Sequence, residues 1–142
     1  MRSKSLCARK LGNVVVFVHG SRAPTDSEWE SVLDYYRQAP DASRLRALVY
    51  TEGGAPDAKQ RARLVELGHA QARIAVLTTS ALARAAGIAV SWFIPHLRLF
   101  KPSEVERALD HLETTTTERV ELRQTLAELR REIAQSTEQP RT

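Results

Sequence analysis

Three short polar segments of the chain carry the residue types that could do chemistry. Each follows an apolar run, and the segments are His19-Gly20-Ser21-Arg22, Thr51-Glu52-Gly53-Gly54 and Thr78-Thr79-Ser80. A neutral imidazole such as that of His19 is a good ligand for cobalt, iron or nickel. Two adjacent glycines before a helix could present backbone N–H groups to a phosphate. These segments supply most of our candidate partner- or ligand-binding residues: His19, Ser21, Arg22, Thr51, Gly53, Gly54, Thr79 and Ser80.

Each segment also has a simpler structural interpretation. Gly20 would permit a tight turn at a strand end, and Thr79 and Ser80 would cap the helix that follows them. The glycine pair has no Walker lysine pattern or G-x-G-x-x-G around it, and the chain has no G-x-S-x-G nucleophile motif. We therefore predict binding residues without a catalytic set, a metal-ligand set or a cofactor.

Alternating strand and helix patterns are expected to position these segments. Apolar runs predict four strands, at 14–18, 45–50, 74–77 and 97–100. Capping-box spacings predict that helices begin at Thr25 and Ser103. The order β-α-β-α-β-α-β-α predicts an α/β domain with a mainly parallel four-stranded sheet, in which the strands at 14–18 and 74–77 are neighbours. Ligands bind outside the carboxyl ends of such strands, where the three polar segments fall.

The helix expected after Ser80 is unusually rich in alanine. Gly87 suggests that this helix approaches the sheet closely. Its apolar residues at helical spacing are Leu82, Ala86, Ala89 and Phe93. Trp92 is expected to pack on the sheet, but an exposed Trp92 would mark a partner surface, so it joins the candidate binding residues.

The C-terminal part of the chain carries an apolar stripe on one helix face. Its members follow a four-three-four spacing and are Leu122, Leu126, Leu129 and Ile133. Such a stripe packs against a second copy, against a partner or back on its own sheet. Because the threonine run before it could act as a hinge, we predict a homodimer held partly by these four residues. The sequence leaves open whether residues 103–135 form one helix or two helices joined by a hinge.

Length, cysteine content and charge limit the possible classes. The 142 residues predict one α/β domain at 13–112, with a flexible basic arm at 1–12, an amphipathic helix at 113–136 and a disordered tail at 137–142. A single cysteine excludes an intrachain disulfide. No apolar run suits a signal peptide or a membrane span, so we expect a cytoplasmic protein without a membrane partner. The basic residues are scattered, so nucleic acid is not an expected partner.

A further group of residues carries a family resemblance. RIAVLTTSAL, SWF and LRLFKPSEVERALDHL lie within 73–112, and LVYTEGGAPDAKQR lies at 48–61. They resemble the STAS-like superfamily, in its anti-sigma-factor-antagonist-like branch. The resemblance implies a regulatory module that binds proteins in bacterial signalling. Phosphorylated members carry a serine-rich loop where this chain has Thr51 as the only hydroxyl, so serine phosphorylation of that loop is not implied. Phosphorylation of Thr51 or Ser80 stays open.

The segment VFVHGSR at 16–22 resembles a second family. It is similar to the HGSR signature of sirohydrochlorin metal chelatases, in which the histidine handles the metal. The second histidine motif of those enzymes is missing here. Our functional prediction is therefore a non-enzymatic regulatory or protein-interaction module, and the alternative is a small chelatase-like metal-handling enzyme that uses His19.

Overall fold

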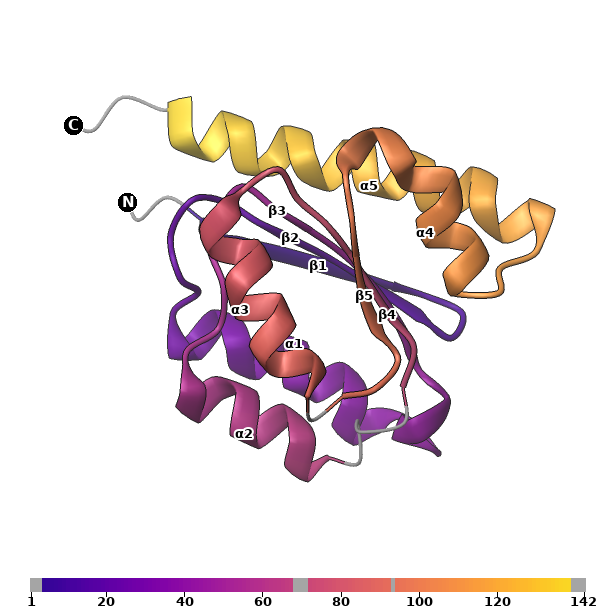
Figure 1. Ribbon diagram of the computed structural model, residues 1–142, viewed down its shortest axis with the longest axis horizontal. Helices are drawn as coiled ribbons and strands as arrows, with labels where there is room; N and C mark the ends of the chain where they lie inside the picture. Colours follow the sequence, from indigo (N-terminus) through magenta and orange to yellow (C-terminus); the bar gives the residue numbers. More distant parts are fainter. Residues whose placement is uncertain (1–3, 68–71, 93, 139–142) are drawn as a thin grey trace.

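The computed structural model describes residues 4–67, 72–92 and 94–138. The start of the predicted arm, most of the predicted tail and Phe93 lie outside this range. The strands are β1 (Leu6–Leu11), β2 (Val14–His19), β3 (Arg46–Thr51), β4 (Ile74–Leu77) and β5 (Leu97–Phe100) (Figure 1). The α-helices are α1 (Asp26–Gln38), α2 (Ala58–Glu66), α3 (Ala81–Ser91), α4 (Val105–His111) and α5 (Thr116–Glu138). Short 3₁₀ turns are η1 (Ala42–Arg44) and η3 (Pro102–Glu104).

The strands lie in the sheet in the order in which they occur in the chain. β2, β3, β4 and β5 run parallel, and β1 pairs antiparallel with β2. The α/β class is thus confirmed, but the expected four-stranded sheet is a five-stranded mixed sheet. The expected pairing of the strands at 14–18 and 74–77 is wrong, because β3 lies between them.

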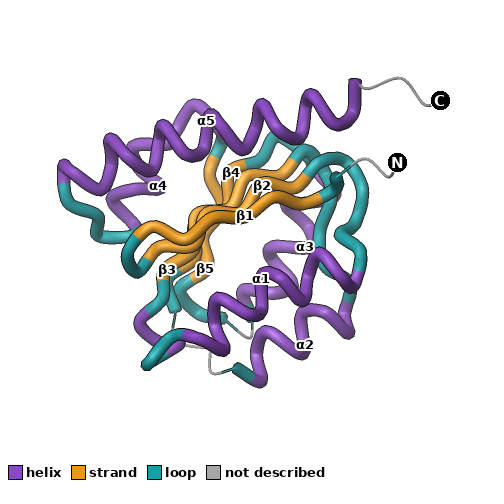
Figure 2. The backbone as a smooth tube through the Cα atoms, turned by 180° about the vertical axis from the view of Figure 1, so that it is seen from behind, coloured by secondary structure: helices purple, strands orange, loops and turns teal. Residues whose placement is uncertain are grey.

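Helices cover both faces of the sheet. α1, α2 and α3 each connect two neighbouring parallel strands, and right-handed crossovers place all three on one face. Figure 2 shows them together, with α4 and α5 across the opposite face. Successive side chains of a strand point to opposite faces, so each strand contributes to two cores. Val16 and Leu48 pack toward α4 and α5, whereas Phe17 packs toward α1, α2 and α3.

The N-terminal segment contains a strand where the sequence predicted a flexible arm at 1–12. Gly12, with φ of 56°, lies in the turn that folds β1 back onto β2. Leu6 is buried, and Arg9 forms an ion pair with Glu128 of α5 at 2.7 Å. The basic residues suggested a solvated arm, but Arg9 has a partner far away in the sequence.

Of the two capping boxes that the sequence predicts, the structure contains one. Thr25 and Glu28 form the predicted box at the start of α1. The capping box predicted from Ser103 is wrong. Instead, the carboxylate of Glu104 accepts a hydrogen bond from the backbone N–H of Lys101 at 2.9 Å. The 3₁₀ turn η3 therefore comes first, and α4 begins after it at Val105.

The chain after residue 103 forms two helices, because it changes direction at Glu113. Glu113 has a left-handed backbone, with φ of 55°. Thr115 and Glu118 then exchange side-chain and backbone hydrogen bonds of 3.1 and 2.9 Å, which form a capping box for α5. Arg46 of β3 donates to the Leu112 carbonyl at 2.9 Å and pairs with Glu118, so it holds the two helix ends together.

The apolar stripe of α5 packs on the sheet of its own chain. All four members are buried in the core that α4 and α5 form with the sheet: Leu122, Leu126, Leu129 and Ile133. Their side chains are therefore already covered within one chain, and they expose no apolar face for the predicted homodimer contact. The reason is that this face of the sheet carries its own apolar side chains, which α5 covers. The homodimer itself stays a prediction.

Candidate functional site

The three polar segments meet at one edge of the sheet. His19 and Thr51 are opposite each other in the parallel register of β2 and β3. The hydroxyl of Thr78 donates to the Thr51 carbonyl at 2.8 Å. The N–H of Gly54 donates to the Gly20 carbonyl at 2.9 Å. The carboxyl ends of the parallel strands thus bring together segments that are far apart in the sequence, as such sheets do.

The glycine pair serves the packing of these loops against each other. A Cβ on Gly54 would lie 2.1 Å from the carbonyl oxygen of Arg22, and Gly53 has φ of 140°. The Gly53 N–H donates to the Thr51 hydroxyl at 3.0 Å, and the Gly54 N–H is bonded to the loop after β2. Both N–H groups are therefore used inside the protein, and neither is left to hold a phosphate.

The hydroxyls at this edge have different surroundings. Thr51 is buried and donates to the Gly54 carbonyl, so a kinase could not reach it in this conformation. Ser80 caps α3 by accepting the Ala83 N–H at 3.2 Å. Ser21 and Thr79 are exposed, as is Arg22. The predicted candidates thus form a contiguous edge but do not converge on a catalytic arrangement.

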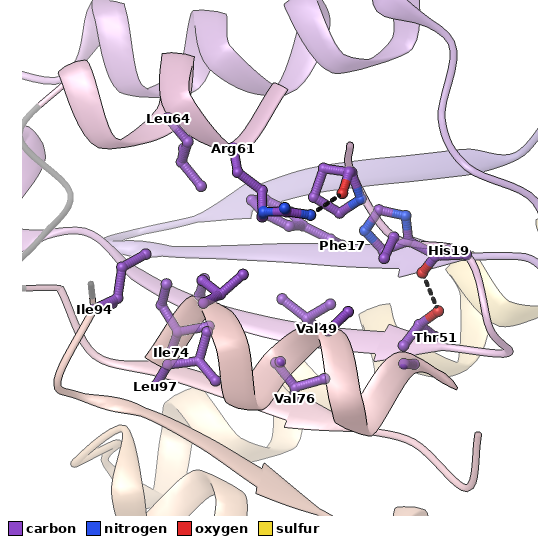
Figure 3. Close-up of a pocket in the computed structure, with 18 of the residues that line it drawn as sticks. Phe17, His19, Val49, Thr51, Arg61, Leu64, Ile74, Val76, Ile94 and Leu97 are labelled. Atoms are coloured by element: carbon purple, nitrogen blue, oxygen red, sulfur yellow. Dashed lines mark hydrogen bonds between the residues drawn. The ribbon is translucent and has the colours of Figure 1, made fainter. Parts of the chain in front are cut away.

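A mostly apolar cavity of about 110 Å³ lies beside this edge, between the sheet and the helices α1, α2 and α3. Figure 3 shows it with Thr51 and His19 at one end and Ile94 and Leu97 at the other. Its walls come from four strands and three helices, and they include Phe17, His19, Trp29, Val49, Arg61 and Val76. We take this cavity as the candidate ligand site.

Small residues on the inner side of α3 leave the space that forms the cavity. Ala83, Ala86, Gly87 and Val90 line it from that helix. A Cβ on Gly87 would lie 2.7 Å from the Leu99 side chain, so the helix lies tightly against β5 at this point. The short alanine side chains beside it cannot fill the volume next to Val76 and Val49. The close approach that Gly87 suggested in the sequence is therefore present.

His19 contributes a buried polar group to the cavity wall. Its side chain is 3% exposed, and its Nδ1 has no hydrogen-bond partner among the described residues. Burial lowers the pKa of His19 to about 4, so the imidazole is neutral at pH 7. The Trp29 ring lies with its centroid 6.5 Å from that of His19. A buried nitrogen without a partner is costly, so it favours an additional group that hydrogen-bonds to it.

Arg61 contributes the positive charge of the cavity. Its Nη1 donates to the Pro56 carbonyl at 2.8 Å, which holds the guanidinium against the loop before α2 (Figure 3). Among the described residues no carboxylate forms an ion pair with it. Neighbouring Arg63, in contrast, pairs with Glu30. The cavity therefore has mostly apolar walls, together with an imidazole nitrogen and a guanidinium that have no hydrogen-bond partner and no counter-ion, respectively, among the described residues.

His19 has no set of further metal ligands beside it among the described residues. The described parts of the chain contain no group of three His, Cys, Asp or Glu side chains that could hold a metal ion. The wall around His19 consists mostly of aromatic and aliphatic side chains. Such surroundings suit an apolar molecule better than a divalent cation, which needs several charged or polar ligands.

The outer face of α3 is apolar and exposed to solvent. Leu82 is 76% exposed, Ile88 51% and Trp92 78%. The expected sheet-facing positions of Leu82 and Ala89 are wrong, because both are exposed and the helix turns Ala83, Ala86, Gly87 and Val90 toward the sheet instead. Trp92, the ninth candidate residue, is thus exposed, which is the arrangement that marks a partner surface.

Sequence reasoning missed Arg61 and Trp29 as cavity residues. Both belong to helices that face the sheet, and their meeting with His19 depends on tertiary packing. The one local signal was the alanine-rich stretch of α3, whose small side chains could have indicated a space beneath the helix.

Comparisons of the chain with protein-family models, with curated proteins and with solved structures find no match. Within the described residues, no helix combines the length and the apolar character needed to cross a membrane. The function must therefore be inferred from the geometry of the chain itself.

Proposed function

We propose that this chain is a non-enzymatic regulatory module of a bacterial signalling system, and that it binds a protein partner in the cytoplasm through the outer face of α3. The observation that carries the proposal is the exposed apolar surface formed by Leu82, Ile88 and Trp92. The resemblance of 73–112 to STAS-like regulatory domains supports it. The polar loops at the edge of the sheet, which bond mainly to one another, also suit binding better than catalysis.

The outer face of α3 has the composition of a protein-binding surface. α3 is apolar except for Arg84 and Ser91, and a helix that is apolar nearly all round is normally buried on most sides, whereas α3 has a cover on one side only. Tryptophan is enriched among the residues that contribute most to binding, and leucine and isoleucine around it exclude water. Ser80 and Arg84 add polar groups beside this surface. We expect a partner with a complementary apolar groove or helix face.

A capture experiment with a double variant tests this proposal. Leu82→Glu with Trp92→Glu places two charges on the outer face of α3, whereas Val120→Glu places one on the exposed side of α5 across the sheet. A protein captured from the native host by the wild type and by Val120→Glu should be lost with the double variant. Calorimetry with that purified protein should show at least about a tenfold loss of affinity.

The same variants test whether the partner is a second copy. In that case light scattering should give a dimer mass for the wild type and for Val120→Glu, and a monomer mass for the double variant. A partner that binds all three proteins equally would contradict the assignment of the surface to α3. The alternative, a chelatase-like enzyme that uses His19, has the unpaired Nδ1 of His19 in its favour but no set of further metal ligands beside it among the described residues.

A further inference from the structure

We infer that the cavity beneath α3 binds a small apolar carboxylic acid, with its hydrocarbon part against Phe17, Val49 and Val76 and its carboxylate between Arg61 and His19. This site is separate from the partner surface on the outer face of α3, and the inference does not depend on the proposed protein-binding function. Its evidence is the combination of a mostly apolar cavity with a buried nitrogen that has no partner, and a cation that has no counter-ion, in the part of the chain that the structure describes.

The volume and walls determine the size and character of the ligand. At about 110 Å³ the cavity is of the same order as an engineered cavity of ~150 Å³ that holds benzene. Most of the wall is aliphatic or aromatic. A ligand that buries one ring or a short branched hydrocarbon chain against this wall would lose its hydration shell without leaving polar groups unpaired. A sugar or a nucleotide would meet few hydrogen-bond partners here.

Arg61 determines the sign of the charge on the ligand. A carboxylate forms short, strong hydrogen bonds with a guanidinium, and Arg61 still has donors beyond the one bonded to Pro56. Val65, one turn along α2 and partly exposed, also lines the cavity, so the Arg61 side lies toward solvent. The carboxylate could thus stay near the opening while the hydrocarbon part enters. An ammonium group at the same place would meet the positive charge of Arg61.

His19 supplies a second, neutral contact to the carboxylate. Because the imidazole is neutral, one of its nitrogens carries a hydrogen, and Nδ1 can donate it to an acceptor in the cavity. The carboxylate of Glu28 lies close enough to influence His19, but it already accepts hydrogen bonds from Ser5, Leu6 and Thr25. A ligand carboxylate is therefore the natural partner for the group that the protein leaves unpaired.

Tryptophan fluorescence can report binding directly, because one of the two tryptophans lies in the cavity wall. In a Trp92→Phe background, Trp29 is the only tryptophan that remains. Benzoate is the test ligand, and benzyl alcohol and benzylamine are its neutral and cationic counterparts of similar size. We expect saturable quenching by benzoate, at least about tenfold tighter than by benzyl alcohol, and none by benzylamine over the same range.

Matched variants identify the residues responsible. Arg61→Met should weaken benzoate binding about tenfold and leave benzyl alcohol unchanged. Lys59→Met, which removes an exposed charge from the same helix, should change neither. Ala86→Leu, which fills the cavity, should abolish both. Circular dichroism confirms that each variant is folded.

Four results would overturn the inference. The first is the absence of saturable quenching by benzoate, and the second is equal affinity for benzoate and benzyl alcohol. The third is an equal loss of benzoate binding in Arg61→Met and Lys59→Met, since it would show that only the net charge of the protein matters. Calorimetry on the full chain with both tryptophans present should reproduce the order of affinities, and a reversed order would also refute the inference.

Discussion

Replacement of Leu129 by alanine should destabilise the folded chain by about 2.5 to 5 kcal/mol. The Leu129 side chain is 2% exposed and lies in the core between α5 and the sheet. The change removes about three buried carbon atoms, each worth ~0.8 kcal/mol in lost transfer free energy. The space left behind adds a further cost that depends on how far α5 can settle onto the sheet, up to about as much again.

Urea unfolding followed by far-UV circular dichroism measures this change. With a slope of about 2 kcal/mol per molar urea, the midpoint should fall by roughly 1.2 to 2.5 M. Val120 lies on the same helix but is 65% exposed, so Val120→Ala should cost less than about 0.5 kcal/mol. If α5 packs on its own sheet, neither the wild-type midpoint nor the size of the Leu129→Ala effect should depend on protein concentration.

Two results would refute this account of α5. One is a Leu129→Ala variant no less stable than Val120→Ala, because a leucine at an open surface costs little to truncate. The other is a wild-type midpoint that rises with protein concentration while that of Leu129→Ala does not. That pattern would mean that the stripe is covered by a second chain, as the sequence alone had suggested.

Two further predictions concern the loops and the cavity. Gly54→Ala should cost about 2 to 4 kcal/mol, because its Cβ would lie 2.1 Å from the Arg22 carbonyl oxygen. The Gly54→Ala variant should melt at a much lower temperature than Gly20→Ala, whose new Cβ would meet Ile133 at 3.4 Å. Equal melting temperatures of the two variants would contradict the close contact between Gly54 and the Arg22 carbonyl. His19 should make stability depend on pH, because burial lowers its pKa from 6.5 to about 4 and only the unfolded chain takes up the proton between these values. Its contribution is complete above pH 6.5, and on the order of 3 kcal/mol is lost as the pH falls to 4. When the pH is lowered from 6.5 to 4, the urea midpoint of His19→Gln should therefore fall less than that of the wild type. An NMR titration of His19 centred near pH 6.5 would contradict this prediction.

Local sequence patterns determined most of the secondary structure. The run at 14–18 is a strand because its β-branched side chains are buried on both faces, and the caps at Thr25 and Ser80 begin helices because their side chains bond to N–H groups three residues ahead. These interactions lie within a few residues of the chain, so they can be predicted from it. The meeting of three polar loops at one sheet edge followed from the order of strands and helices alone.

The tertiary structure alone decided how these elements pair and what they enclose. A stripe such as that of α5 has the same spacing whether it meets a second chain or its own sheet, and only the sheet decides between them. The pairing of Arg9 with Glu128, separated by 119 positions, turned an expected arm into a region tied to α5. The cavity likewise exists because the small side chains of α3 lie over Val49 and Val76, while Arg61 arrives from another helix. Such contacts depend on the packing of residues far apart in the chain, which local periodicity does not encode.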